Sequence, residues 1–484
     1  MTITITSNNI PSKPHVAFLP SPGNGHITPL FELAQRLVTK HDIEVTFFVI
    51  TTGATVAQNN YFNAYKPHPH LHLHHLPPAD MSPFPLDEMT AVARLCTVVR
   101  ESIRPLRSIL SAMKNLKAFI VDIFCTDAFE PCKELSIPVY SFFTASAALM
   151  ALSLYLPKMD REVEGEFVDL LEPVKVPGCN PIRIQDLLDQ IRDRKIDEYK
   201  WYLFHVARLS MAAGIFMNVW DDLEPVTMKA VRHEPFFVNI PTPPVHTIGP
   251  LTKQIEPVLD RHDKEIIAWL DDQPKDSVLF VALGSGGTVT SEQLTELAWG
   301  LELSQQRFVL VVRKPNDIPG AAFFNAGSDS DDPMSYLPEG FVERTTGVGL
   351  VVCSWAPQVA VLNHGSTGAF MSHCGWNSTL ESIKHGVPMI GWPMYAEQRM
   401  NASMLSDEIG VAVKMGVVGE GGETVVVGRD EIAKVVRNVM EGEEGKKIRK
   451  RARELEASGK VTLSCGGSSY ESLARVIESW KSET

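Results

Sequence analysis

Two series of short apolar segments, one in each half of the chain, set its overall pattern. The first series comprises residues 15–20, 45–50, 118–124, 139–143 and 214–220, and the second comprises residues 277–284, 307–312, 349–355, 369–375 and 387–392. Apolar residues follow one another in these segments instead of alternating with polar ones, which predicts strands buried on both faces of a parallel sheet. The longer amphipathic stretches between them predict helices that cover each sheet.

A Pro-rich stretch at residues 240–257 separates the two series. The pattern therefore predicts an α/β protein with two doubly wound, Rossmann-like domains that face each other across a cleft. We expect an N-terminal domain over residues 1–250, a linker over 251–263, a C-terminal domain over 264–463, and a last segment, 464–484, whose helix returns to the N-terminal domain. Such sheets bind ligands beyond the carboxyl ends of their strands, so the chemistry is expected in the loops that follow them.

Composition narrows the classes of partner. The chain has 484 residues and a net charge of −13, which argues against nucleic acid or an anionic membrane as the main partner. No apolar run approaches the roughly 18 residues needed to span a bilayer, and the first residues lack the pattern of a secretory signal. The seven cysteines are scattered without a C-x-x-C pair, which indicates thiols in a reducing compartment. We therefore expect a cytoplasmic protein without membrane insertion, and we expect a monomer.

The segment GAFMSHCGWNSTLESIKHGVPMIGWPMYAEQ, residues 368–398, passes from an apolar strand through a Gly-containing turn to a helical pattern. The helix is expected to begin near Asn377 or Ser378 and to stop before Gly386. The amides at its start have no partner within the helix and carry about half a unit of positive charge. These amides could hold a diphosphate by themselves, so the site would not need basic side chains. Lys384 is the only Lys or Arg in the segment.

The same residues have interpretations that need no ligand. Ser378 and Glu381 have the S-x-x-E spacing of a capping box, which would satisfy the start of the helix by itself. His373 could be a buried core histidine, and Trp355 and Trp376 could serve packing alone.

Residues 355–398 carry the motifs WAPQ, HCGWNS, ESIKHGVP and EQ at spacings that resemble the signature segment of plant secondary-product UDP-glycosyltransferases. The likeness extends along the chain through PSPGNGHITPL, FIVDIFCTDAF and LFVALGSGGT, and is nearest to the hydroquinone (phenol) glucosyltransferases. The resemblance implies the GT-B arrangement, in which the N-terminal domain binds the acceptor and the C-terminal domain binds the UDP-sugar. It also implies UDP-glucose as donor substrate, a small phenolic acceptor, and no cofactor or metal.

The resemblance assigns roles on the donor side. Trp355 would stack on uracil, Gln358 and Glu381 would hold the ribose, and Gln at position 398 would favour glucose over galactose. Thr144 would contact the 6-hydroxyl of glucose, with a helix cap as its alternative. The remaining residues of the implied UDP-sugar site are Ser285, Ala356, His373, Trp376, Asn377, Ser378 and Glu397.

A second candidate, His26, follows the first strand in SPGNGHITPL. The turn Gly23-Asn24-Gly25 would present His26 at the end of that strand, just before a helix that begins at Thr28 and Pro29. A dinucleotide fingerprint would need Gly at position 28, so the G-x-G is a weak nucleotide signal. A single histidine in a turn is usually an exposed residue without a functional role, but this one resembles the catalytic base of the family.

A neutral imidazole can take a proton from an acceptor hydroxyl, and a carboxylate would orient the ring. Asp122 and Asp127 are both available in FIVDIFCTDAF. The resemblance implies that Asp122 is the orienting residue, while Asp127 is expected to be structural, with a helix cap as the role considered. The implied reaction is direct displacement at the anomeric carbon with inversion from α to β.

The acceptor site is expected in loops of the N-terminal half, with Glu88, Phe124 and Phe143 as candidates. The subgroup resemblance suggests hydroquinone-, stilbenoid- or phenylpropanoid-like phenols. Two other functions stay open at this stage. A UDP-sugar epimerase would need no second substrate, and a UDP-sugar sensor would bind without turnover.

Two patterns imitate metal sites. His68, His70, His72 and His74 alternate along one face of an extended segment, which we interpret as the polar face of an outer strand because four aligned side chains cannot readily close a tetrahedron. The D-x-D pattern at residues 329–331 lies in a polar loop rather than at a strand end. We therefore expect no metal site.

Overall fold

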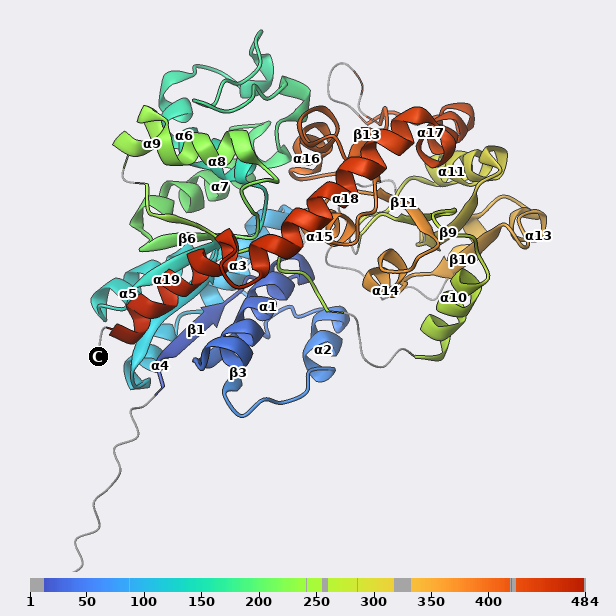
Figure 1. The fold of residues 1–484 in the computed structure, drawn as a ribbon. Helices are drawn as coiled ribbons and strands as arrows, with labels where there is room; N and C mark the ends of the chain where they lie inside the picture. The colour runs from blue at the N-terminus through green and yellow to red at the C-terminus, as the bar shows by residue number, and fades with distance from the viewer. Residues whose placement is uncertain are drawn as a thin grey trace, which may run out of the picture.

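Two parallel β-sheets form the centres of two α/β domains (Figure 1). The computed structural model describes residues 13–86, 88–240, 242–254, 260–284, 286–316, 332–417, 419 and 424–482. All neighbouring strands within the two sheets are parallel. The predicted class of two doubly wound domains is confirmed.

The N-terminal sheet has the order β3-β2-β1-β4-β5-β6-β7. Its strands are β1 His15–Leu19, β2 Glu44–Val49, β3 Leu71–His75, β4 Leu116–Asp122, β5 Val139–Phe143, β6 Gly214–Met217 and β7 Val245–Thr247. Apart from the extra edge strand β7, this is the 3-2-1-4-5-6 order of a Rossmann sheet. The order reverses between β1 and β4, which makes the carboxyl ends of these two strands the expected ligand position.

The C-terminal sheet repeats the same order as β10-β9-β8-β11-β12-β13. Its strands are β8 Val278–Ala282, β9 Arg307–Val312, β10 Gly349–Cys353, β11 Thr367–Ser372, β12 Met389–Gly391 and β13 Ala412–Lys414. Here the order reverses between β8 and β11. All ten apolar segments predicted as strands form strands, and apart from the edge strand β10 their residues are largely buried.

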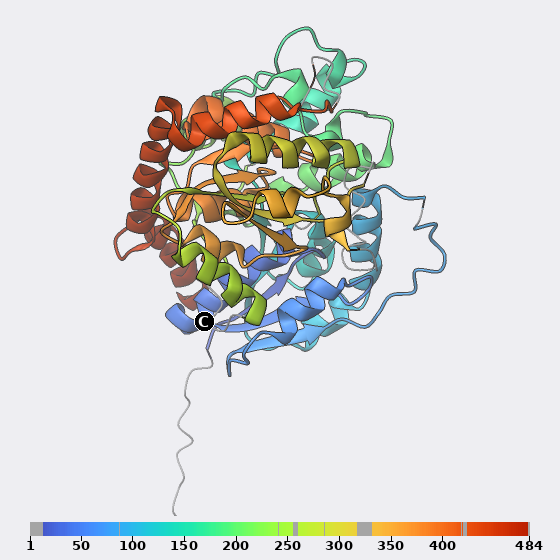
Figure 2. The ribbon, with the colours of Figure 1, turned by 90° about the vertical axis from the view of Figure 1, so that its right-hand side faces the viewer.

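Helices cover both sheets, as Figures 1 and 2 show. In the N-terminal half they are α1 Asn24–His41, α2 Val56–Asn63, α3 Ala91–Ser102, α4 Leu106–Ala112, α5 Phe129–Glu134, α6 Ala147–Glu162, α7 Asp197–Ala207, α8 Pro225–His233 and α9 Pro235–Asn239. In the C-terminal half they are α10 Arg261–Asp271, α11 Ser291–Ser304, α13 Phe341–Arg344, α14 Gln358–Leu362, α15 Trp376–Lys384, α16 Gln398–Met404, α17 Arg429–Glu441, α18 Glu443–Leu463 and α19 Ser468–Ser482.

The last two helices join the domains from outside (Figure 1). The long helix α18 packs on α15 and α17 of the C-terminal half, whereas α19 packs along β7 at the edge of the N-terminal sheet. Trp480 of α19 is buried, with its ring centroid 5.6 Å from that of Tyr140 and 6.3 Å from that of Phe216. The end of the chain thus contributes to the N-terminal core.

Two edge strands differ from the expectations. Val245–Thr247 forms β7 within the Pro-rich stretch that we expected to be only a connection, and Ala412–Lys414 forms β13 without having been predicted. The His-rich segment forms β3 at the edge of its sheet, which confirms the outer strand. His72 of this strand pairs with Glu44, and His74 packs edge-on against Phe48.

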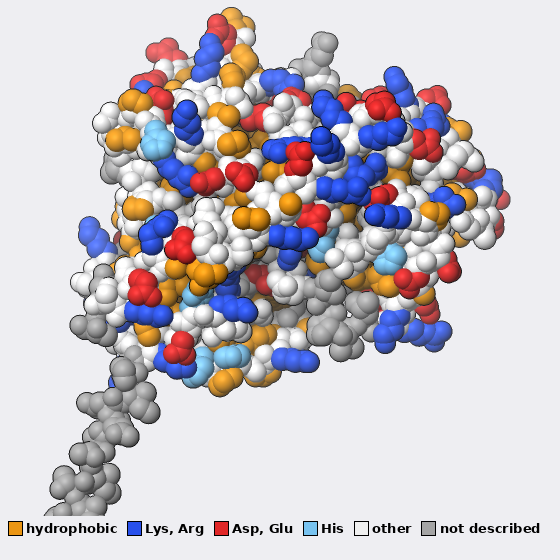
Figure 3. Space-filling view, viewed as in Figure 1, with side chains coloured by type: hydrophobic (Ala, Val, Ile, Leu, Met, Phe, Trp, Pro, Cys, Tyr) orange, Lys and Arg blue, Asp and Glu red, His pale blue; other side chains and the backbone are white. Residues whose placement is uncertain are grey.

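Both signs of charge are interspersed over the face in Figure 3. Several basic side chains along α18 are paired with acidic ones, as in the Lys446–Glu443, Lys460–Glu456 and Arg453–Asp276 contacts. None of the helices in the described ranges combines the length and apolar character that crossing a bilayer requires.

Candidate functional site

His26 lies at the point where the strand order of the N-terminal sheet reverses. Helix α1 begins at Asn24, directly after Gly23, whose φ of 111° suits glycine far better than other residues. His26 therefore lies in the first turn of α1, and the prediction that this helix begins at Thr28 and Pro29 is wrong. Pro29 lies inside the helix and marks no boundary.

Asp122 ends β4, the strand next to β1, and is fully buried. Its Oδ2 lies 2.7 Å from Nδ1 of His26, and its Oδ1 accepts hydrogen bonds from the Ser21 hydroxyl at 2.8 Å and the Phe124 amide at 3.0 Å. Burial would raise the pKa of Asp122, but the facing His26 and these two donors outweigh burial and lower it. Asp122 is thus held as a carboxylate.

The same pairing acts on His26 in the opposite sense. Burial would lower its pKa, yet the charge of Asp122, the hydrogen bond to Asp122 and the charge of Glu397 together raise it. Because Nδ1 is occupied by Asp122, Nε2 is the ring nitrogen left for a ligand, and the His26 side chain is 20% exposed. The pair can orient an imidazole and stabilise its protonated form.

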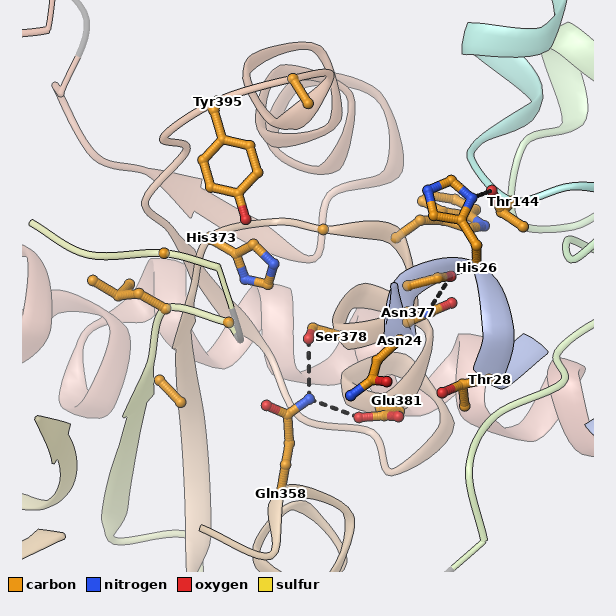
Figure 4. Close-up of a pocket in the computed structure, with 18 of the residues that line it drawn as sticks. Asn24, His26, Thr28, Thr144, Gln358, His373, Asn377, Ser378, Glu381 and Tyr395 are labelled. Carbon is orange, nitrogen blue, oxygen red and sulfur yellow. Dashed lines mark hydrogen bonds between the residues drawn. The ribbon is translucent and has the colours of Figure 1, made fainter. Parts of the chain in front are cut away.

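Two neighbours of this pair differ from their expected local roles. Thr144 does not cap α6, because Ser146 is the N-cap residue and accepts from the Leu149 amide. Instead, Oγ1 of Thr144 lies 3.0 Å from Nδ1 of His26 (Figure 4). Asp127 is not a helix cap either. It forms an ion pair with Arg100 at 3.1 Å.

The C-terminal sheet supplies the helix expected opposite His26. Helix α15 runs from Trp376 to Lys384, within a residue of the predicted start, and is followed by Gly386 in the left-handed region at φ 66°. Its N-cap residue is Gly375, which has no side chain to accept from the first amides. The capping-box interpretation of Ser378 and Glu381 is therefore wrong, since Ser378 lies inside the helix.

Gln358 joins these two residues into one polar group (Figure 4). Its Nε2 donates to Oγ of Ser378 at 3.0 Å and to Oε2 of Glu381 at 2.6 Å. Burial raises the pKa of Glu381 to about 6, although the bond from Gln358 opposes the shift. Gln358 begins α14, so one short helix positions it against α15.

His373 lies in a narrow space at the second reversal of strand order, between the ends of β8 and β11. A Cβ added to Gly284 would come within 2.5 Å of its ring, and one added to Gly375 would come within 2.4 Å. Both glycines are therefore required for the backbone to approach the imidazole. Burial lowers the pKa of His373 to about 4, so the ring is neutral at physiological pH.

The two domains contact each other through residues of α15. Nδ2 of Asn377 donates to the carbonyl of Gly25 at 2.9 Å, and Nε1 of Trp376 donates to the carbonyl of Asn218 at 3.0 Å. In a regular helix the amide of residue 29 would bond the carbonyl of Gly25, but Pro29 has no amide hydrogen. Asn377 thus bonds a carbonyl that the helix leaves open.

These groups line one cavity of about 630 Å³ between the domains. Trp355 lines it and is 55% exposed, so the interpretation of this ring as a packing residue is wrong. The other predicted residues on the cavity wall are His26, Phe124, Phe143, Thr144, Ala356, Gln358, His373, Trp376, Asn377, Ser378, Glu381 and Glu397.

Three of the predicted residues that the structure describes do not line the cavity. Asp122 is behind His26, and Gln398 is buried with its Oε1 accepting from the amides of Met394 and Tyr395. Glu88 is exposed and is not part of the cavity wall. Ser285 lies outside the described residues, as does the D-x-D pattern at 329–331.

Sequence reasoning missed several residues of the site. Ser21, which holds Asp122, stands just before the Gly23 turn, and this position was the available signal. Lys253 and Arg313 also line the cavity, and the sequence analysis named neither of them. Arg313 donates to the carbonyl of Gly284 at 3.1 Å. Neither cation belongs to the segment 368–398.

A family profile and a curated relative both match this chain. The family profile described as UDP-glucoronosyl and UDP-glucosyl transferase matches residues 217–444. A hydroquinone glucosyltransferase from Rauvolfia serpentina is 44% identical over 97% of this chain and 98% of its own.

Two solved structures are similar throughout. TcCGT1 in complex with UDP is 44% identical, with a TM-score of 0.90 over 97% of this chain and 99% of that one. UGT2 of Phytolacca americana, complexed with UDP-2fluoro-glucose and pterostilbene, is 39% identical, with a TM-score of 0.86 over 97% and 99% of the two chains.

Proposed function

The chain belongs to the UDP-glucoronosyl and UDP-glucosyl transferase family, and from this premise we propose that it transfers glucose from UDP-glucose to the hydroxyl group of a small phenol, with inversion. It is a UDP-glycosyltransferase with the GT-B arrangement of two Rossmann-like domains. The phenolic acceptor is supported by the similarity to a hydroquinone glucosyltransferase and to a structure that holds pterostilbene. Phe124 and Phe143 on the cavity wall suit a flat aromatic ring.

The observation that carries the proposal is the shared cavity of His26 and the start of α15. One side of this cavity has an imidazole whose Nδ1 is held by a buried carboxylate. The other side has a helix N-terminus without a side-chain cap, next to neutral donors. A base and a site for a diphosphate leaving group are the two parts that a direct displacement at a sugar carbon needs.

In the proposed reaction, Nε2 of His26 removes the proton of the acceptor hydroxyl. The acceptor oxygen attacks the anomeric carbon, the bond from that carbon to the UDP oxygen breaks, and the configuration changes from α to β. Asp122 orients the ring and stabilises the imidazolium that forms. The proton remains on His26 until it is lost to solvent, and the negative charge that develops on UDP is met by the amides of α15.

Donor binding is proposed to follow the positions around α15. Trp355 stacks on the uracil, while Gln358 and Glu381 hold the ribose hydroxyls. Asn377, Ser378 and His373 contact the diphosphate, together with Ser285. Glu397 faces the hexose, with Gln398 buried beside it, and the proposal includes no metal ion. The contact of Asn377 with Gly25 would be exchanged for the ligand or shared with it.

The test is a product assay with two donors and a panel of phenols. UDP-glucose or UDP-galactose is mixed with hydroquinone, pterostilbene or a monolignol, and the products are identified by mass and by the NMR coupling of the anomeric proton. We expect β-glucosides, with UDP released only when a phenol is present. Conversion of the UDP-hexose without a phenol would instead indicate an epimerase, and binding without turnover across the panel would indicate a sensor.

A further inference from the structure

Two hydrogen bonds connect Asp189, in the N-terminal half of the chain, to the backbone of Ala396 in the C-terminal half. Oδ2 of Asp189 accepts from the Ala396 amide at 2.7 Å, and the Asp189 amide donates to the Ala396 carbonyl at 3.2 Å. Both polar backbone groups of Ala396 are therefore bonded by one residue that lies 207 positions away. Asp189 and Ala396 also both line the cavity.

Ala396 needs such support because of its backbone. Its φ of 56° lies in the left-handed region, where a Cβ crowds the following carbonyl. An alanine has no side-chain group that could offset this cost, so surrounding contacts must impose the conformation. Asp189 supplies two of those contacts directly.

The strained residue stands immediately before Glu397, the residue proposed to face the hexose. Glu397 is the N-cap residue of α16, and Gln398 begins that helix. Oε1 of Gln398 accepts from the amides of Met394 and Tyr395, which holds the turn from its other side. A change at Ala396 would therefore rotate the Glu397 carboxylate relative to the donor sugar.

Asp189 is itself carried by a segment fixed to the C-terminal half. Asp186 bonds Nζ of Lys414 at 2.7 Å and the hydroxyl of Ser403 at 2.8 Å, and Arg183 pairs with Asp407 at 3.1 Å. The 3₁₀ turn Asp189–Ile191 follows these contacts. These contacts hold the segment that carries Asp189 in place beside the turn formed by residues 394–398.

We propose that Asp189 is a positioning residue for the donor sugar, which holds Ala396 in its left-handed conformation and so aims Glu397 at the hexose. The inference rests on the proposed function, in which Glu397 contacts the hexose of UDP-glucose. Asp189 acts on the hexose and not on the nucleotide, because Trp355, Gln358 and Glu381 belong to other elements. Its loss therefore weakens recognition of UDP-glucose and leaves recognition of UDP intact.

The test compares Asp189→Ala with Asp189→Asn and with Asp193→Ala, a change of an exposed aspartate in the same segment. Asp189→Ala should raise KM for UDP-glucose about tenfold, because it removes one hydrogen bond to a charged acceptor. It should also reduce the preference for UDP-glucose over UDP-galactose, while Kd for UDP stays the same by calorimetry. Asparagine keeps an acceptor oxygen for the Ala396 amide and should largely restore KM, and Asp193→Ala should match the wild type.

A double-variant comparison separates positioning from general damage. Glycine adopts a φ of 56° without the cost that alanine has. The rise in KM caused by Asp189→Ala should therefore shrink from about tenfold to about twofold when it is measured in an Ala396→Gly background. An equal rise in both backgrounds, or an unchanged KM in Asp189→Ala, would overturn the inference.

Hydrogen exchange gives a readout that does not depend on turnover. In Asp189→Ala, the amides of residues 394–398 should exchange faster than in the wild type, while those of β11 stay protected. Unchanged exchange at 394–398 would contradict the inference even if the enzyme is active. Faster exchange in a protein that transfers no glucose to any phenol would contradict the proposed function alone.

Discussion

Oγ1 of Thr144 lies 3.0 Å from Nδ1 of His26, the ring nitrogen that also lies 2.7 Å from Oδ2 of Asp122. The imidazole N–H therefore points at two oxygens, one charged and one neutral. The hydroxyl proton of Thr144 remains free to turn toward Asp122, 3.5 Å away, or toward a ligand in the cavity. Thr144, expected either to contact the sugar or to cap a helix, is thus also a partner of the base.

Thr144→Val keeps the shape of the side chain and removes its hydroxyl. With UDP-glucose we expect kcat to fall about 2- to 10-fold, the effect of one lost hydrogen bond, whereas Thr144→Ser should lose less. The loss should be smaller with UDP-xylose, which lacks the hydroxymethyl group that Thr144 is proposed to contact. Equal losses with the two donors, measured at saturation, would leave Thr144 only its role beside His26.

His26→Ala should lower kcat by about 10²–10⁴-fold, since general-base catalysis contributes effects of that size. The loss should decrease along a series of increasingly acidic phenols, because their hydroxyl groups ionise with less help. The matched control is His72→Ala. His72 lies on β3, the edge strand two positions from β1, and does not line the cavity. A constant loss across the phenol series would contradict the assignment of His26 as the base.

Asp122→Asn should move the pH profile as well as lower the rate. The base must be neutral, so kcat/KM rises with pH through the pKa of His26, which Asp122 raises against the opposing effect of burial. Without the carboxylate charge, this limb should shift to lower pH. The plateau should fall by about 10²–10⁴-fold because Asn can favour the wrong tautomer. A limb that stays at its wild-type pH would show that another group is titrating.

UDP binding should not take up a proton at pH 8. Burial holds the pKa of His373 at about 4, so protonation at pH 8 would require a shift of about 4 units, or roughly 5 kcal/mol of interaction with the ligand. Calorimetry in two buffers of different ionisation enthalpy should therefore give the same binding enthalpy. A difference that corresponds to one proton per UDP would mean that the diphosphate is held by a charged His373.

Much of the fold could be predicted because its signals are local and repeated. Each buried strand of a parallel sheet is a continuous apolar run, and ten such runs were sufficient to recognise two sheets. The pairing of His26 with Asp122 came from the resemblance to the family, and the structure brings the two together at the ends of β1 and β4, where the strand order reverses. The short edge strands β7 and β13 have three residues each, too few to show any period.

The errors concern contacts that local rules cannot decide. Thr28–Pro29 resembles a helix start, but Gly23 allows the chain to turn into α1 earlier, and Asn377 from the other domain bonds the carbonyl that Pro29 leaves open. Ser378 has the spacing of a cap, yet the backbone begins α15 after Gly375. The pairing of Asp189 with Ala396 joins residues far apart in the chain, and no periodicity or motif in either segment indicates it.

The most direct test of the account is a crystal structure with UDP and a phenol bound together. The account predicts the β-phosphate at the first amides of α15, the uracil on Trp355, and the phenol oxygen about 2.6–3.2 Å from Nε2 of His26. A uracil bound away from Trp355, or a phenol oxygen directed away from the His26 ring, would contradict it.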